Sequence, residues 1–304
     1  MQKTKRVIAL GFFDGVHRAH GALLGRVKEV ADAIGAVPAA VTFDTHPDQL
    51  VMGSPVALIN SPADRAELMR SEYGIRDVIV AHFDERMMKM PWEEFITQYL
   101  IAEHGAVHLV AGHDFHFGYM GRGNPERLKE KCAELGVGCD IIPKMERDGI
   151  TISSTYIRTL IHQGEMERAA EFLGHPHLLT DTVSHGKKLG STLGFPTVNL
   201  RFQPGVIVPA HGVYATMVTL PDGTRYPAVT NVGVRPTVDR DGNVTVEGFL
   251  LGGFSGDLYG RSVRMEFYKF LREEKRFDSL EELREEVRHN AQQTEAYFRE
   301  NKQS

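Results

Sequence analysis

The hydrophobic pattern of the chain changes near residue 161, and this change constrains the fold more than any other feature. Up to that point, short apolar runs such as residues 39–43 and 108–111 alternate with helical segments. Alternation of this kind is typical of an α/β domain built on a parallel sheet. Beyond it, short β-prone runs are separated by Pro and Gly, which favours a small antiparallel β-barrel. The sequence therefore predicts two domains of different fold class.

The chain is long enough for both domains to have a full core, because it has 304 residues, of which 42% are hydrophobic. We predict an N-terminal domain over residues 1–163, a connector over 164–178 and a C-terminal domain over 179–304. The charged segment that begins at Leu280 has apolar residues in helical phase. We expect it to form a terminal helix that packs on the barrel.

A glycine turn with two histidines follows the first apolar run. Residues 11–20 have the sequence Gly-Phe-Phe-Asp-Gly-Val-His-Arg-Ala-His and come directly after the run at 7–10. The spacing predicts a helix over 16–30, with His17 and His20 on one face near its first turn. Free backbone N–H groups at a helix start favour an anion, and imidazoles can stabilise charge that develops on phosphates. We interpret this segment as a nucleotide-phosphate site.

Two histidines at this spacing also have simpler explanations. In isolation they are more often polar residues on a solvated helix end. A zinc site would need further ligands, and Cys132 and Cys139 are too far apart in sequence to form a paired-cysteine motif. The zinc interpretation is therefore disfavoured.

A second motif lies at residues 152–158, with the sequence Ile-Ser-Ser-Thr-Tyr-Ile-Arg. One of its three hydroxyls can cap the helix that follows, and Arg158 would then lie one turn in, able to reach a phosphate. The alternative is an ordinary helix cap with a surface arginine.

Together the two motifs resemble those of the nucleotidyltransferase superfamily, with the forms GxFDGxHxGH and ISSTxIR, and the resemblance is closest to bacterial FAD synthetase. Residues 42–47 and 112–118 are similar to the flavin-side loops of that family. The resemblance implies a Rossmann-like domain that transfers AMP from ATP to FMN and releases pyrophosphate. The implied catalytic residues are His17, His20 and Arg158. The implied ATP-binding residues are Gly11, Phe13, Asp14, Gly15, His17, His20, Ser153, Ser154, Thr155 and Arg158, and the implied flavin-binding residues are His46, Pro47, Asp114, Phe115 and Phe117.

This part of the chain departs from the family at three positions. Phe12 replaces a small or polar residue, Ala19 replaces glycine and Thr45 replaces proline. Ala19 adds only a methyl group within a helix, which should be tolerated. Phe12 has no side-chain donor, so any contact with phosphate from this position must come from its backbone.

The C-terminal part carries a second phosphate-binding pattern. The glycine-rich residues 186–190 lead into 193–200, which have the sequence Leu-Gly-Phe-Pro-Thr-Val-Asn-Leu. Glycines let backbone N–H groups approach phosphates closely. Thr197 and Asn199 offer hard oxygen ligands for magnesium, and residues two apart on a strand point the same way. The alternative is a strand between turns with solvated lysines; no Walker loop occurs in the sequence.

The order of these and later motifs resembles riboflavin kinase, which is fused behind the adenylyltransferase in bacterial FAD synthetases. The resemblance implies Glu247 as the catalytic base, Arg272 as a flavin-binding residue, and Thr197 and Asn199 as magnesium ligands. The implied ATP-binding residues are Gly186, Lys187, Gly190 and Thr197. Glu247 could instead be an outward residue on an alternating strand.

Two residues depart from the kinase family. Phe249 replaces a polar aromatic residue, and Asp181 replaces glycine shortly before the predicted ATP loop. The Asp181 carboxylate could repel ATP, or it could point to solvent or cap a turn.

Composition limits the class of partner and the compartment. A net charge of −5 disfavours a nucleic-acid binder. Two cysteines give no disulfide framework, the basic start precedes too short an apolar run for a secretory segment, and no run approaches the roughly 20 apolar residues of a membrane helix. We expect a cytoplasmic protein and leave its oligomeric state open.

Together the two resemblances imply a bifunctional flavin-cofactor enzyme that phosphorylates riboflavin and then adenylylates FMN. Its expected substrates are riboflavin, FMN and ATP, with Mg²⁺ as the metal. Two alternatives stay open: only one of the two activities is retained, or the chain is a flavin-binding regulatory protein without turnover.

Overall fold

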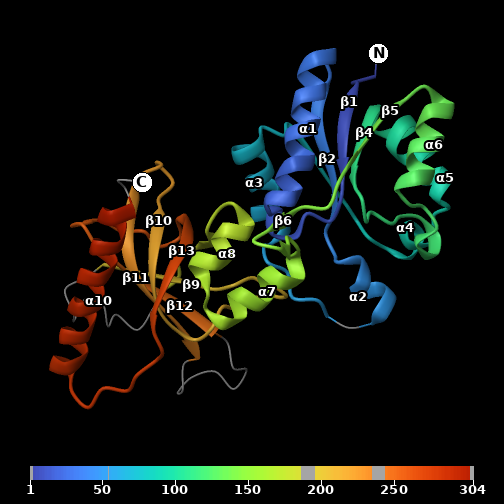
Figure 1. The fold of residues 1–304 in the computed structure, drawn as a ribbon. Helices are drawn as coiled ribbons and strands as arrows, with labels where there is room; N and C mark the ends of the chain where they lie inside the picture. Colours follow the sequence, from blue (N-terminus) through green and yellow to red (C-terminus); the bar gives the residue numbers. More distant parts are fainter. Residues whose placement is uncertain (1–2, 54, 186–195, 235–243, 302–304) are drawn as a thin grey trace. The chain divides into compact units, whose positions relative to one another are not determined.

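The structure is a computed structural model that describes residues 3–53, 55–185, 196–234 and 244–301. The chain divides into two compact units, Met1–Ser154 and Thr155–Ser304 (Figure 1). Two units were expected from the sequence. The predicted connector over 164–178 stays a prediction.

The first unit is built on a five-stranded sheet. Its strands are β1 (Arg6–Leu10), β2 (Val37–Phe43), β3 (Asp77–Ala81), β4 (Ala106–Gly112) and β5 (Gly138–Ile142). They lie in the order β3-β2-β1-β4-β5, and every neighbouring pair is parallel. This confirms the predicted parallel α/β domain. A short hairpin follows, made of β6 (Glu146–Arg147) and β7 (Ile150–Thr151).

Helices cover both faces of this sheet, with α1 and α3 on one side and α5 and α6 on the other (Figure 1). The α-helices are α1 (Arg18–Ile34), α2 (Pro47–Met52), α3 (Pro62–Tyr73), α4 (Glu85–Lys89), α5 (Trp92–Glu94) and α6 (Pro125–Leu135). Two short 3-10 turns, η1 (Asp14–Val16) and η3 (Tyr119–Gly121), and a π-helix, η2 (Phe95–Glu103), complete the set.

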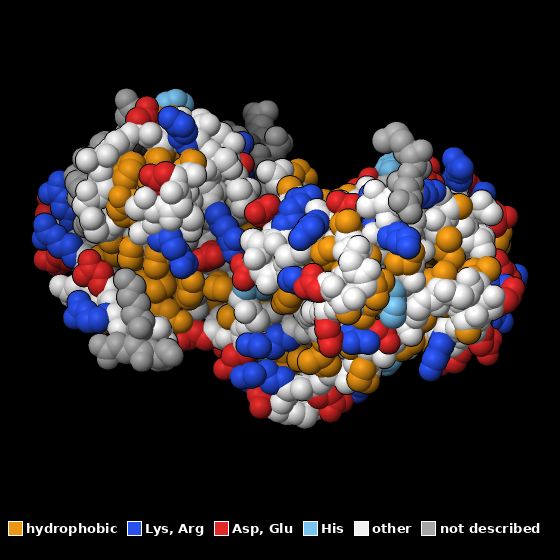
Figure 2. Space-filling view, turned by 90° about the horizontal axis from the view of Figure 1, so that it is seen from above, with side chains coloured by type: hydrophobic (Ala, Val, Ile, Leu, Met, Phe, Trp, Pro, Cys, Tyr) orange, Lys and Arg blue, Asp and Glu red, His pale blue; other side chains and the backbone are white. Residues whose placement is uncertain are grey.

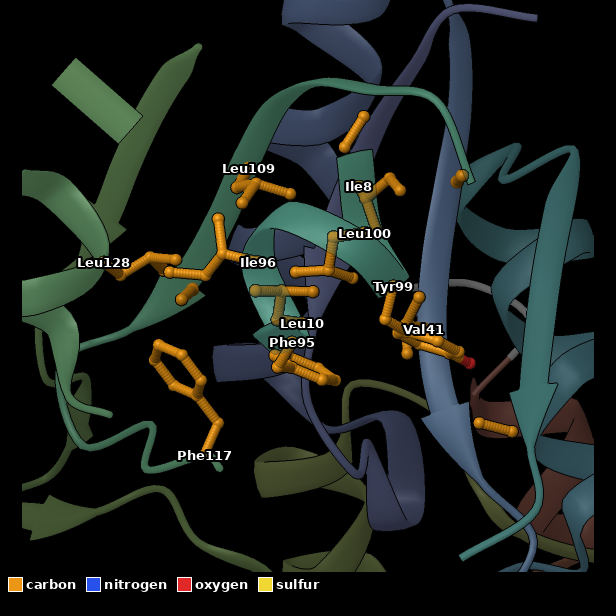
Figure 3. Packing of buried hydrophobic residues seen from close by; sticks show 14 of the residues in the cluster. Ile8, Leu10, Val41, Phe95, Ile96, Tyr99, Leu100, Leu109, Phe117 and Leu128 are labelled. Carbon is orange, nitrogen blue, oxygen red and sulfur yellow. The ribbon is translucent and has the colours of Figure 1, made fainter. Parts of the chain in front are cut away.

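The hydrophobic core of the first unit lies between the sheet and η2 (Figure 3). Ile8, Leu10 and Val41 extend from the strands toward Ile96 and Leu100 of η2, and all five are almost fully buried. Because β1 is buried in this way, the residues that follow it are held at a fixed place at the carboxyl edge of the sheet.

Helix α1 begins at Arg18, two residues later than the sequence predicted. Val16 has φ 41°, in the left-handed region, and His17 is extended, so neither residue has the backbone of an α-helix and α1 begins after them. The apolar face of α1 is as predicted, since Leu23 and Val27 are buried against the sheet.

The second unit contains a six-stranded antiparallel sheet in the order β8-β13-β10-β11-β12-β9. Its strands are β8 (His177–Thr182), β9 (Thr197–Leu200), β10 (Gly212–Thr219), β11 (Arg225–Val234), β12 (Val244–Leu250) and β13 (Ser262–Arg272). The two ends of the sheet meet where Ser184, just after β8, forms a bridge with Asn199 of β9. The predicted small antiparallel barrel is therefore confirmed, with its edges joined by this isolated bridge.

In the part of the second unit that the structure describes, three helices accompany the barrel. They are α7 (Ser154–Gln163), α8 (Met166–Leu173) and α10 (Leu280–Asn301). α10 packs on β10 and β11, which confirms the predicted terminal helix.

None of the helices that the structure describes is long and apolar enough to cross a membrane. Lys and Arg side chains lie interspersed with Asp and Glu over the face shown in Figure 2.

His177, at the start of β8, is completely buried between the rings of Phe202 and Phe267, with centroid distances of 6.0 and 5.8 Å. Neither ring nitrogen has a hydrogen-bond partner among the residues that the structure describes. Burial lowers the pKa of His177 to about 3. The folded unit therefore holds a neutral imidazole, whereas the unfolded chain takes up a proton once the pH falls below about 6.5.

We expect this histidine to make the second unit sensitive to acid. Its contribution to stability is fully present above pH 6.5 and is lost progressively as the pH falls toward 3, which amounts to about 2 kcal/mol between pH 7 and pH 5. His177→Phe should remove most of this loss, whereas His211→Phe, at an exposed position, should not. Urea unfolding at the two pH values measures the difference. An equal loss in wild type and His177→Phe would contradict the prediction.

Candidate active sites in the two units

The first unit has a cavity of about 570 Å³ at the carboxyl edge of its sheet. It lies at the carboxyl ends of β1, β2, β4 and β5. At this point the strand order reverses, because β2 and β3 lie on one side of β1 and β4 and β5 lie on the other. This is the position at which open parallel sheets bind their ligands. The predicted residues that line it are Gly11, His17, His20, His46, Pro47, Asp114, Phe115, Ser153 and Ser154.

The turn after β1 has an unusual backbone. Phe13 and Val16 have φ of 58° and 41°, although neither is glycine, and Gly15 between them has φ 78°. A left-handed β-branched residue is strained, and such strain is found where function demands a particular geometry. Here the turn places His17 at the N-cap position of α1. It also places Phe13, Asp14 and Gly15 beneath the cavity wall, so these three predicted ATP contacts do not line the cavity.

His17 and His20 lie against each other as the sequence predicted. Their rings are stacked with a centroid distance of 3.5 Å, and Nδ1 of His17 accepts a hydrogen bond from the His20 backbone N–H at 3.3 Å. His17 is thus the N-cap of α1, and His20 lies in the first turn. Nδ1 of His20 is buried without a partner among the described residues.

Burial lowers the pKa of His20 well below its usual value, and the charges of His17 and Arg65 lower it further. The ring is therefore neutral at pH 7 in the free chain. An anion in the cavity would favour the protonated ring, because an opposite charge stabilises it. Binding of a phosphate next to the two histidines should therefore raise the pKa of His20.

Asp14 joins the two predicted motifs. Its carboxylate accepts a hydrogen bond from the Ile59 backbone N–H at 2.8 Å, and its carbonyl accepts one from the Ser154 hydroxyl at 3.0 Å. Asp14 therefore positions Ser154 at the cavity. Thr155 and Arg158 follow on α7 within the second unit, and their contact with ATP stays a prediction.

The flavin-side residues divide into lining and supporting positions. His46 caps α2 through Nδ1, which accepts from the Asp48 backbone N–H at 3.2 Å, and its ring meets the Phe12 ring at 4.5 Å. Phe115 lines the cavity, whereas Phe117 does not. Phe117 is buried behind Phe115, with a ring distance of 5.4 Å, and belongs to the core.

Sequence reasoning missed Arg65, which is completely buried next to this site. Its guanidinium donates to the backbone carbonyls of Phe12 and Phe43, each at 2.7 Å. A signal was present, because Arg65 lies three and four residues before the buried Leu68 and Met69 on α3. An arginine within an apolar helical stripe is a candidate for a buried role.

The second unit has a cavity of about 190 Å³ between its sheet and α10, and Glu247 lines it. Glu247 on β12 is paired directly with Asn199 on β9 and Asn231 on β11. Directly paired residues of antiparallel strands point to the same face. The three side chains therefore form one row across three strands.

Glu247 faces outward from the barrel, as the simpler interpretation of its strand expected, but it faces into this cavity. The next residue, Gly248, points to the interior, where a side chain in its place would lie 2.8 Å from Met265 and 3.1 Å from Val198. Thr197 is paired with Phe249 and so shares the face of Glu247. Thr197, Asn199 and Glu247 are thus brought together.

Arg272, the predicted flavin contact, lines the same cavity. Its Nε lies 3.0 Å from the Glu286 carboxylate and 3.2 Å from the Asn290 side-chain oxygen, both on α10. The Asn231 side chain, which also lines the cavity, donates to the Glu274 carboxylate at 3.2 Å. Gly186, Lys187 and Gly190, the predicted ATP loop, lie outside the described residues.

Asp181 has a structural partner. Its carboxylate accepts a hydrogen bond from the Arg201 backbone N–H at 2.8 Å. Of the two roles that the sequence left open, this contact favours the structural one.

Comparison with known proteins finds a matching family for each of the two units. The family profile described as FAD synthetase matches residues 1–156, and that described as riboflavin kinase matches residues 173–298. A bifunctional riboflavin kinase/FMN adenylyltransferase from Bacillus subtilis is 34% identical over 302 residues, which cover 98% of this chain and 94% of the relative. A protein of the same name from Pseudomonas fluorescens is 36% identical over 278 residues, covering 91% and 88%.

A solved structure from Streptococcus pneumoniae, described as a macrolide-efflux protein, has a TM-score of 0.83 and 28% identity and covers 97% of this chain and 95% of its own. The two unit folds therefore occur together in one known chain. With both family profiles matched and the relatives aligned over nearly their full length, the chain belongs to the family of bifunctional riboflavin kinase/FMN adenylyltransferases.

Proposed function

We propose that the chain makes both flavin cofactors. Its second unit phosphorylates riboflavin with ATP to give FMN and ADP, and its first unit transfers AMP from ATP to FMN to give FAD and pyrophosphate. The observation that carries the proposal is that each unit has its own cavity lined by its own motif residues: His17 and His20 in one, Glu247 in the other.

In the kinase step, Glu247 accepts the proton of the riboflavin primary hydroxyl as that oxygen attacks the γ-phosphorus of ATP. The bond between the γ-phosphorus and the bridging oxygen breaks, and ADP leaves. A positioned base of this kind contributes roughly 10²–10⁴-fold. Asn199 and Asn231 flank Glu247 on the two neighbouring strands and share its face of the sheet.

Thr197 and Asn199 fit a magnesium site. They are oxygen-bearing side chains two apart on β9, and both share the face of Glu247. The described residues contain no group of three or more His, Cys, Asp or Glu that could hold a metal. Few protein ligands suit Mg²⁺, which takes its other ligands from phosphate oxygens and water. When bound, the ion neutralises charge on the ATP phosphates.

In the adenylyl step, an FMN phosphate oxygen attacks the α-phosphorus of ATP. The bond from the α-phosphorus to its bridging oxygen breaks, and pyrophosphate leaves. The nucleophile is already ionised, so no base is needed. His17, His20 and the N-terminus of α1 stabilise the charge that develops on the phosphates, and Arg158 adds a further positive charge.

We also propose that the protein acts in the cytoplasm and without a nucleic-acid partner. Its net charge of −5 and its two cysteines, both free thiols, support this assignment.

The direct test is to incubate the purified protein with riboflavin, ATP and MgCl₂ and to resolve flavins by chromatography. We expect FMN to appear first and FAD to follow with pyrophosphate, and EDTA to stop both. FMN without FAD, or conversion of supplied FMN alone, would favour a chain with one activity. Flavin binding without any product would favour a regulatory protein.

Asp181 provides a more specific prediction. Because its carboxylate is engaged by the Arg201 amide, Asp181→Gly should leave the KM for ATP in the kinase reaction within about twofold of wild type. The variant should lose about 0.5–1.5 kcal/mol of stability with the hydrogen bond. Steady-state rates over a range of ATP and urea unfolding measure the two effects. A lower KM for ATP in the glycine variant would mean that the carboxylate repels phosphate.

A further inference from the structure

One buried arginine bridges the two strand ends that border the cavity of the first unit. Arg65 donates to the carbonyl of Phe12, just after β1, and to the carbonyl of Phe43, the last residue of β2. The Phe12 carbonyl also accepts from the Thr42 hydroxyl at 2.7 Å. Phe12 and Phe43 both line the cavity, and Arg65 lies behind them.

The same guanidinium supports an aromatic wall. Its central carbon lies 4.2 Å from the centre of the Phe12 ring. The Phe12 ring also contacts the His46 ring edge to face, with a distance of 4.5 Å between the ring centroids. Arg65, Phe12 and His46 are therefore linked by two consecutive contacts, from the buried guanidinium to the His46 ring that lines the cavity.

Stability alone does not explain why an arginine lies here, because burying its charge lowers the free energy of unfolding. Burial lowers the pKa of Arg65 to about 10, and the nearby carboxylates of Asp14 and Asp44 oppose that shift, so the side chain is still charged at pH 7. Its Nε is buried without a partner among the described residues. An apolar side chain would be easier to accommodate in this helical stripe, because a buried charge must be compensated by its contacts. The geometry it imposes on the cavity wall is a reason to keep it.

We propose that Arg65 is a positioning residue for FMN in the adenylyl-transfer cavity. It fixes the Phe12 and Phe43 carbonyls and the Phe12 ring so that the wall formed by Phe12 and His46 receives the planar isoalloxazine ring. This inference rests on the proposed function of the first unit. Arg65 does not touch the substrate; it acts through Phe12.

Arg65→Met tests the inference by removing the donors and the charge at similar length. We expect the KM for FMN to rise about tenfold, the scale of losing a cation–π contact and a buried hydrogen bond, with the KM for ATP within about twofold. Arg65→Lys retains the charge and three donors, and it should keep the KM for FMN within about threefold. Arg70→Met, at an exposed position on the same helix, is the matched control and should behave as wild type.

The kinase reaction of each sample serves as an internal control, because it belongs to the other unit. A rise in both KM values, no change in either, or no rescue by lysine would overturn the inference. If Arg65→Met does not fold, Phe12→Leu carries the test, because it removes the supported ring and leaves Arg65 in place. It should raise the KM for FMN by a similar factor, and an unchanged KM would overturn the inference.

The double variant of Phe12→Leu and Arg65→Met gives a final check. Because Arg65 acts through Phe12, the second substitution should add less than about threefold to the effect of the first. Fully multiplicative effects would show that Arg65 acts by another route. If the wild-type protein makes no FAD from FMN, the proposed function itself fails, which is a different result from wild-type turnover with an unchanged KM in the variants.

Discussion

We expect Glu247→Gln to abolish FMN formation from riboflavin and to leave the conversion of supplied FMN to FAD close to the wild-type rate. The riboflavin hydroxyl must lose a proton as it attacks, and Gln cannot accept it, so the loss should be at least about 10²-fold. The FMN phosphate needs no such base. The substitution keeps the size of the side chain in the row with Asn199 and Asn231, so the effect should be chemical and not structural.

Separate assays with riboflavin and with FMN measure the two activities in the same sample. Glu285→Gln, at an exposed position on α10, is the matched control and should leave both activities unchanged. Loss of both activities in a folded Glu247→Gln protein would contradict the assignment, and so would a kinase rate within about threefold of wild type.

The two unit folds could be predicted because each depends on a hydrophobic periodicity that single substitutions do not change. The buried strands of the first unit are continuous apolar runs, as at Ile8 and Leu10, and those of the barrel alternate between its interior and its outer face, as at Val246 and Glu247. Period alone separates these two cases. The pairing of Glu247 with Asn199 could not be predicted, because it depends on the strand register, which cannot be read from the sequence.

The turn after β1 shows where prediction from sequence stops. Phe13, Asp14 and Gly15 lie beneath the cavity instead of lining it, because the chain adopts a left-handed backbone at Phe13 and Val16. Such a conformation is disfavoured for both residues taken alone and is imposed by the surrounding structure. Motif membership therefore points to a segment that borders the cavity, but it does not tell which residues of the segment line it.

Similar side chains two residues apart were also not distinguished. Phe115 lines the cavity, whereas Phe117 is held in the core by an isolated bridge to Gly123. Arg65 was missed for the opposite reason: arginine is rarely buried, so its place in an apolar stripe was outweighed by residue type. Both cases depend on tertiary contacts between segments far apart in the chain.

His20→Ala should lower FAD formation from FMN by roughly 10²–10³-fold, the scale of losing one positioned donor to developing charge, and should leave the kinase unchanged. His20 is the ring whose Nδ1 is buried without a partner among the described residues and whose pKa is lowered by burial, by His17 and by Arg65. We expect a similar loss for Arg158→Ala, because the proposed role of its guanidinium is to contact the ATP phosphates. His162→Ala, an exposed histidine on the same helix, is the control.

The pH dependence of the wild-type reaction distinguishes donation by His20 from a purely structural role. The free cavity holds the neutral ring because its pKa is lowered, and bound phosphate opposes that shift by favouring the protonated form. The group should therefore ionise at a higher pH in the ATP complex, seen in kcat, than in the free enzyme, seen in kcat/KM. His20→Ala should remove this difference. If FAD output is unchanged in His20→Ala, the histidine pair only caps α1, and the charge on the leaving pyrophosphate must be stabilised by other donors.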